Sequence, residues 1–168
     1  MPLVKTSLVN GLRKFMDAQY SSFDAFPAKE NDAITAIIDA VDQYASNVTP
    51  MSKTASTAKS AMQETLTGMG GANQAISKIQ DGFTQYVTLL ATGMIGSPVT
   101  APAGAIVSTS IAPSGKIPID AVGNIGLNGG SSEDVANLIG TIADTWFKTG
   151  MTMVTLPNGT TATGPTWL

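Results

Sequence analysis

The chain has 168 residues, of which 43% are hydrophobic, so it is long enough to bury a sizeable core within one domain. Only 12% of the residues are charged, and the net charge of −3 with scattered basic residues argues against nucleic acid as a main partner. Because there is no His and no Cys, the composition excludes the commonest general base, thiol catalysis, disulfides and cysteine metal sites.

The low charge density bears on self-association. Copies of a sparsely charged protein repel one another weakly, which favours assembly; the alternative is a monomer with a neutral surface. The longest uncharged run lies between Asp81 and Lys116, where Pro98, Pro102 and several glycines interrupt the apolar residues. No continuous apolar stretch of about twenty residues remains, so no membrane span is predicted.

Four helices are predicted in residues 1–92, from apolar residues that recur at intervals of three and four. Their predicted ranges are Leu3 to Tyr20, about Ala28 to Ser46, about Thr57 to Gly68, and Asn73 to about Thr92. Gly11 is expected to weaken the first helix by about 1 kcal/mol relative to Ala. Pro27 is expected to hold Phe26 in an extended conformation, which leaves Phe23 and Phe26 as loop anchors.

Few residues suggest chemistry. Asp39 and Asp42 lie off the apolar stripe of the second helix, and such a pair is compatible with acid–base catalysis or a metal site. The favoured interpretation is a solvated helix face. Ser–Lys pairs such as Ser52-Lys53 lack the helical Ser-x-x-Lys spacing. No catalytic residue, cofactor or metal ligand is therefore predicted, and the chain is expected not to be an enzyme.

Residues 93–130 form a Gly/Pro/Thr-rich arm with short β-branched pieces. Ala105 to Ile111 and Lys116 to Ile119 are predicted as a short strand pair, joined by a turn at Pro113-Ser114-Gly115. So long a segment with little regular structure is commonly functional, disordered or a contact arm. A contact arm is favoured, because the segment is apolar and almost uncharged.

Residues 131–150 carry the best-defined helix signal, and we expect this helix and the one ending near Thr92 to be core partners. Ser131 is predicted to cap the N-terminus, with Asp134 in the position of the reciprocal cap. Gly150 is predicted to end the helix in a left-handed conformation. The apolar stripe consists of Val135, Leu138, Ile139, Ile142, Trp146 and Phe147.

Residues 151–168 predict a β-hairpin tail. Its strands are Met151 to Leu156 and Thr160 to Thr163, and the turn is Pro157-Asn158-Gly159, since Asn-Gly between extended runs is a strong hairpin signal. Trp167 is expected either in the protein's own core, which is favoured, or inserted into a neighbouring copy.

These elements predict a mainly α protein with a small β part (α+β). We expect a bundle of about five helices, a C-terminal β-hairpin and a short strand pair in the middle. The chain is expected to be a single domain, 1–168, made of a helical part (1–92), the arm (93–130), the core helix (131–150) and the hairpin tail (151–168).

In composition and layout the chain resembles small structural proteins of tailed-phage virions. The likeness rests on the helical N-terminal half, the uncharged Gly/Pro/Thr-rich middle, the tail TGMTMVTLPNGTTATGPTW and the absence of His and Cys. It covers the whole length without a motif, so no functional residue carries over. The resemblance implies a head–tail connector or neck, tail, baseplate or capsid-decoration subunit, which acts in many symmetric copies and is located in the virion after assembly in the host cytoplasm.

We expect this subunit to bind copies of itself and other virion proteins through the arm and the hairpin. Removing residues 157–168 is expected to abolish assembly and to spare the helical core. The alternative is a helical module that binds a small ligand or a peptide in a pocket near Trp146. The candidate interface residues are Val99, Ile106, Val107, Ile111, Ile117, Met153, Val154, Leu156 and Trp167.

Overall fold

The structure, a computed structural model, describes residues 3–20, 26–48, 51–52, 57–68, 72–93, 95–96, 106–120 and 131–167. This part of the chain contains helices and two small sheets, which confirms the prediction of a mainly α protein with a small β part. The helices are α1 (Lys5–Tyr20), α2 (Phe26–Ala45), α3 (Thr57–Leu66), α4 (Ala72–Gly93) and α6 (Ser132–Phe147). The strands are β1 (Met51–Ser52), β2 (Ile95–Gly96), β3 (Ile106–Ile111), β4 (Met151–Thr155) and β5 (Thr161–Thr166).

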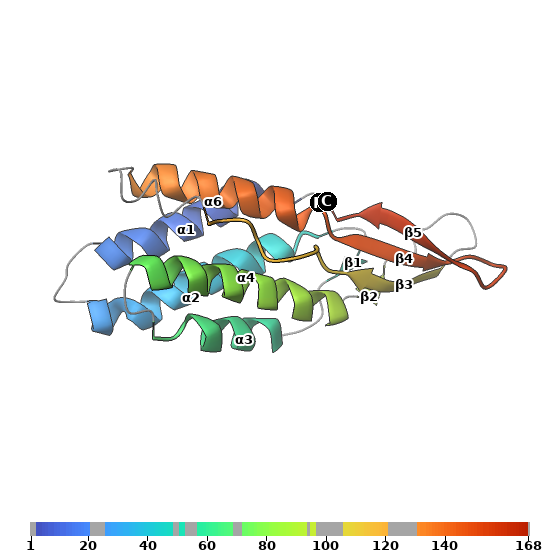
Figure 1. Cartoon of the computed structure of the whole chain (residues 1–168), viewed down its shortest axis with the longest axis horizontal. Coiled ribbons are helices and arrows are strands. Elements are labelled where there is room, and N and C mark those ends of the chain that lie inside the picture. The colour runs from blue at the N-terminus through green and yellow to red at the C-terminus, as the bar shows by residue number, and fades with distance from the viewer. Residues whose placement is uncertain are drawn as a thin grey trace.

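The helices run along the long axis of the molecule, and the larger sheet lies at one end of it (Figure 1). α1 packs against both α2 and α6, whereas α3 packs mainly against α4. Their apolar stripes meet in one hydrophobic core, to which Ile117, Ile119 and Trp167 also contribute. No helix in the described ranges is long and apolar enough to cross a membrane.

α1 and α2 approach each other closely at Gly11, which gives this glycine a packing role. A Cβ atom built on Gly11 would lie only 1.9 Å from the Cβ of Ala40 and 3.2 Å from its Cα. The helix contact therefore requires a residue without a side chain at this position. Glycine lowers the intrinsic helix propensity of α1, as expected from the sequence. It also allows a close helix–helix contact that any larger residue would prevent.

The predicted N-cap of α6 is confirmed. The Oγ of Ser131 accepts a hydrogen bond from the backbone N–H of Asp134 at 3.1 Å, and the N–H of Ser131 donates to Asp134 Oδ2 at 3.3 Å. The predicted left-handed conformation of Gly150 is wrong, because Gly150 is not among the described glycines with positive φ. Glycine is needed there for space, since a Cβ would lie 2.4 Å from Cδ2 of the Trp167 indole.

The start of α2 also differs from the prediction. Phe26 is helical, so the expected extended conformation at this residue is wrong. Pro27 lies in the first turn of the helix, where its missing N–H has no helical acceptor to lose. Phe23 lies outside the described residues.

The larger sheet has the strand order β3-β4-β5, and both pairings are antiparallel. β4 and β5 form the predicted hairpin. The predicted pairing of the two middle segments is wrong, because β3 pairs with β4, from Ile106↔Thr155 to Ile111↔Met151. A second, two-stranded sheet pairs β1 with β2, and β2 lies at the start of the predicted arm.

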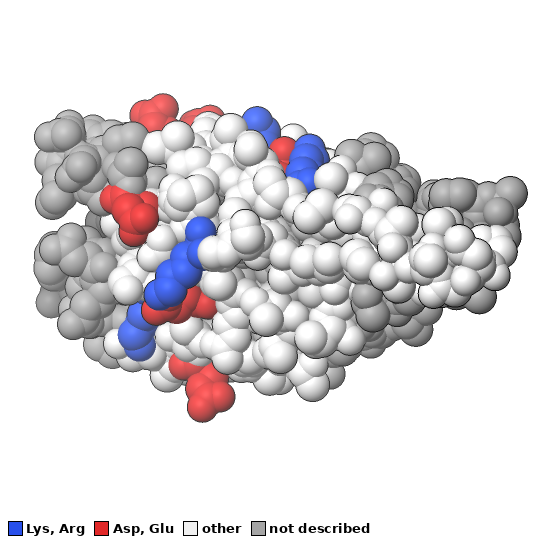
Figure 2. All heavy atoms as spheres, turned by 45° about the vertical axis from the view of Figure 1, so that its right-hand side comes forward, with Lys and Arg blue, Asp and Glu red and all other residues white. Residues whose placement is uncertain are grey.

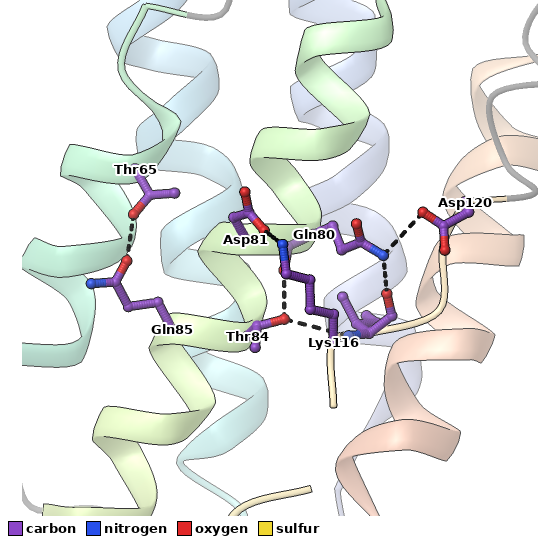
Figure 3. Close-up of polar contacts among 8 residues, drawn as sticks. Thr65, Gln80, Asp81, Thr84, Gln85, Lys116 and Asp120 are labelled. Carbon is purple, nitrogen blue, oxygen red and sulfur yellow. Dashed lines mark hydrogen bonds and ion pairs between the residues drawn. The ribbon is translucent and has the colours of Figure 1, made fainter. Parts of the chain in front are cut away.

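Residues 116–120 lie on α4 instead of forming a strand, and polar side chains of α4 hold them there (Figure 3). Gln80 Nε2 donates to the carbonyl oxygen of Ile117 at 2.8 Å and to Asp120 Oδ1 at 3.2 Å. Lys116 Nζ lies 2.6 Å from Asp81 Oδ1. These contacts fix the backbone of the segment, so that it runs along the helix.

The same segment separates α4 from α6, as its trace between the two helices shows (Figure 1). Ile117 and Ile119 of this segment are fully buried, and Trp146 Nε1 on α6 donates to the carbonyl oxygen of Ser114, two residues before the segment, at 3.4 Å. The prediction that these two helices are core partners is confirmed, because both contribute to one hydrophobic core, although this segment lies between them. They share one core, but α6 packs along α1 and α4 along α3.

Candidate assembly surface

The β4–β5 hairpin lies at the sheet end of the molecule, and its turn fixes its register. The Leu156 N–H donates to the carbonyl oxygen of Thr160 at 2.8 Å, and the Gly159 N–H donates to that of Leu156 at 2.8 Å. Gly159 has a φ of 79°, a left-handed conformation that glycine adopts without strain. Asn158 Oδ1 accepts from the Thr160 N–H at 3.0 Å. The predicted turn is confirmed, and its residues are exposed.

Trp167 anchors the base of the hairpin to the helical body. Its side chain is fully buried, and its ring lies 5.0 Å from the ring of Phe147 at the end of α6. Its Nε1 donates to Ser110 Oγ at 3.0 Å, and its backbone N–H donates to the carbonyl oxygen of Gly150 at 2.8 Å. Trp167 therefore connects the sheet to the core, as the favoured alternative for its position predicts.

The two faces of the sheet differ in burial. Along β4, Thr152 and Val154 are buried, whereas Met151, Met153 and Thr155 are partly exposed. Successive side chains of a strand point to opposite faces, so the first pair marks the inward face and the other three mark the outward face.

Directly paired residues on neighbouring strands share a face, so the outward face extends from β4 across the sheet. Ile111 is opposite Met151 on β3, and Thr163 is opposite Met153 on β5. We call this surface the Met/Thr face. Its residues with described side chains are Ile111, Met151, Met153, Thr155, Thr161, Thr163 and Thr166.

This surface carries no charge. All Lys, Arg, Asp and Glu residues lie at positions 5–81 and 116–148, so none belongs to a strand of the larger sheet. Figure 2 shows charged side chains over the helical body and none over the described atoms of the sheet end on this side. Ile111 is 40% exposed, and the only other large hydrophobic side chain found so exposed among the described residues is Val4, at 42%.

The structure corrects three of the predicted interface residues. Ile117, Val154 and Trp167 are 0%, 3% and 0% exposed, respectively, and so belong to the protein's own interior. Because Trp167 is a core residue, removing residues 157–168 would also disturb the core, contrary to the expectation from the sequence.

The other predicted interface residues do not all lie on one surface. Ile111 and Met153 lie on the Met/Thr face, and Leu156 is partly exposed at the start of the turn. Ile106 and Val107 belong to β3 and pair with Thr155 and Val154. Val99 lies outside the described residues.

The prediction missed Met151 and Thr163, although the sequence contains a signal for them. Residues two apart on a strand share a face, so Met153 implies Met151 and excludes its neighbour Val154. Thr163 requires the hairpin register, which follows from the three-residue turn Pro157-Asn158-Gly159, centred on Asn158.

Two acidic residues of α2, Asp39 and Asp42, contact side chains of α3 and α4. Asp39 Oδ1 lies 2.9 Å and Asp42 Oδ2 lies 3.8 Å from Nζ of Lys59 on α3. Asp42 Oδ1 also accepts a hydrogen bond from the hydroxyl of Tyr86 on α4 at 2.9 Å. These contacts indicate a structural role in holding α2, α3 and α4 together. In the described ranges, no three His, Cys, Asp or Glu side chains gather as a metal site requires.

A second tyrosine–aspartate contact connects α2 to α6. The hydroxyl of Tyr44 donates to Asp144 Oδ1 at 2.6 Å, and Lys148 Nζ lies 2.9 Å from Asp144 Oδ2. Burial, the hydrogen bond and the negative charge of Asp144 raise the pKa of Tyr44 above its ordinary value of 10.0. Burial and Asp42 raise the pKa of Tyr86 in the same way.

Because of these two tyrosines, we expect the folded protein to lose stability at alkaline pH. Above pH 10 the unfolded chain ionises both side chains, whereas the folded chain keeps them neutral, so raising the pH favours unfolding. The free energy of unfolding should fall by about 1.4 kcal/mol per pH unit for each tyrosine. Tyrosinate absorbance measured against pH should show Tyr44 and Tyr86 titrating only as the circular dichroism signal is lost. The Tyr44→Phe/Tyr86→Phe variant should lose this dependence; titration of both tyrosines in the folded protein would contradict the account.

The pocket expected near Trp146 is occupied by the protein itself. Trp146 is only 7% exposed, and its indole is bonded to the 112–120 segment. A shallow hollow of about 320 Å³ lies elsewhere, between α2 and α3, where the Lys59–Asp39 ion pair forms part of its lining. Neither place favours the ligand-binding alternative.

Comparisons of the chain with protein-family models, with curated proteins and with solved structures find no match.

Proposed function

We propose that this chain is a non-enzymatic structural subunit of a symmetric assembly and that it binds its neighbours through the sheet end. The observation that carries the proposal is the separation of charge along the molecule. The described charged residues lie in or beside the helices, whereas the larger sheet has none (Figure 2). The sheet also exposes Ile111.

This separation suits contact between proteins. Burying a charged side chain at an interface costs desolvation energy, and the centres of protein interfaces are accordingly depleted in charge. The sheet end meets that requirement with threonine, methionine and isoleucine, while the charged body remains in water. A reaction site would need the opposite arrangement, with polar groups converging in a cleft.

Within this class we propose a component of a tailed-phage virion, as a head–tail connector or neck, tail, baseplate or capsid-decoration subunit. The support is the layout: a helical body, an uncharged sheet and a terminal hairpin, without His or Cys. Such a subunit would act through contacts with its own copies and with other virion proteins.

The proposal is tested by a matched pair of substitutions, Ile111→Lys and Val4→Lys. Both side chains are similarly exposed, at 40% and 42%, but only Ile111 lies on the sheet. Ile111→Lys should lower the mass of the assembled species measured by light scattering, because it places a charge within the contact. Val4→Lys should leave that mass unchanged. Equal behaviour of the two variants would argue against the sheet end as the binding surface.

A further inference from the structure

The composition of the Met/Thr face points to a particular partner. Resting on the proposed function, we infer that a second copy of this chain packs against the Met/Thr face in a two-fold symmetric contact. The two sheets would then meet face to face, as the sheets of a β-sandwich do.

The arrangement of side chains on the face supports such a contact. Its apolar members, Ile111, Met151 and Met153, occupy β4 and the adjoining end of β3. Exposed threonines lie beside them along β5, at Thr161, Thr163 and Thr166. An apolar centre with an uncharged polar margin is the usual composition of a protein interface, in which methionine is enriched.

The edges of the sheet are less suitable for pairing with another strand. β5 contains Pro165, which has no N–H to donate, and proline is a common means of protecting an edge strand. The opposite edge strand, β3, lies beside β2 and α4. The face is therefore the open surface of this sheet.

The distribution of charge favours a copy of the same chain over a charged partner. In a two-fold contact each surface meets itself, so any charge near the axis would face an identical charge. The Met/Thr face has none. Each copy carries a net charge of −3, and the described charged residues lie in or beside the helices, outside the three strands of the larger sheet.

The inference is tested by charge reversal at one position. Thr163 is exposed and lies opposite Met153, so it is about 4.8 Å, one strand spacing, from the central strand. Thr163→Glu and Thr163→Lys should each raise the dissociation constant of the pair at least tenfold, because identical charges meet. A one-to-one mixture of the two variants should restore association, because opposite charges then face each other. Thr145→Glu, on the exposed surface of α6, is the control and should change nothing.

The outcomes separate this inference from the proposed function. Light scattering of each variant and of the mixture gives the mass, and circular dichroism checks that each variant is folded. Dissociation of both variants with rescue in the mixture supports the two-fold contact. Dissociation without rescue, or an unchanged mass in both variants while the parent protein assembles, overturns it and leaves assembly through another contact. A monomeric parent protein at every concentration overturns the two-fold contact and removes self-assembly from the proposed function as well.

Discussion

Gly11→Ala should destabilise the protein by about 2–3 kcal/mol, although alanine is the better helix former. The added Cβ would lie 1.9 Å from the Cβ of Ala40, so α1 and α2 must move apart or their side chains must shift. For a chain of this size the loss corresponds to a fall of about 6–10 °C in Tm. Urea unfolding followed by circular dichroism measures it.

Two controls identify the cause of this loss. Asn10→Ala, at the exposed neighbouring position of α1, should change stability by no more than about 0.5 kcal/mol. The double variant Gly11→Ala/Ala40→Gly removes the opposing Cβ and should recover a large part of the loss, which gives a coupling energy of about 1 kcal/mol or more. Additive effects of the two substitutions would contradict the close contact.

Trp167→Ala should cost about 3–5 kcal/mol, the usual range for removing a buried aromatic side chain. The side chain is fully buried, packs on Phe147 and donates to Ser110, so its loss leaves a cavity where the sheet joins the helical body. Denaturant unfolding followed by circular dichroism is the measurement.

Thr166→Ala provides the matched comparison, because Thr166 is the exposed last residue of β5, directly before Trp167, and its substitution should change stability by less than about 0.5 kcal/mol. Trp167→Phe should fall between the two, since it keeps a ring and loses the hydrogen bond to Ser110. A cost below about 1 kcal/mol for Trp167→Ala would place this side chain outside the core.

The helices could be predicted because each has an apolar stripe, and a stripe depends only on residues close in sequence. The buried residues of α3, Ala58, Met62 and Leu66, are those that the spacing indicates. The capping box at Ser131 was predictable for the same reason. The packing roles of Gly11 and Gly150 could not be predicted, because each glycine is in close contact with a residue distant in sequence. Gly11 lies against Ala40, and Gly150 lies against Trp167.

The partner of β3, and which face of the larger sheet is buried, could not be predicted from the sequence. β3 pairs with β4 across about 40 intervening residues, a choice that depends on the whole fold. β4 reads MTMVT, in which threonine and apolar residues occur on both faces, so hydrophobic alternation does not show which face is inward. The alternation of a strand does show that Met153 and Val154 lie on opposite faces, so only one of the two could belong to the interface.

The most direct test of assembly through the sheet end is the mass of the purified protein in solution, measured by light scattering across a concentration series. We expect a discrete oligomer, or a mass that grows with concentration, and in either case a mass that Ile111→Lys reduces. Because the contact is uncharged, raising the salt concentration should not weaken it. A mass equal to one chain, 17.2 kDa, at every concentration would contradict self-assembly.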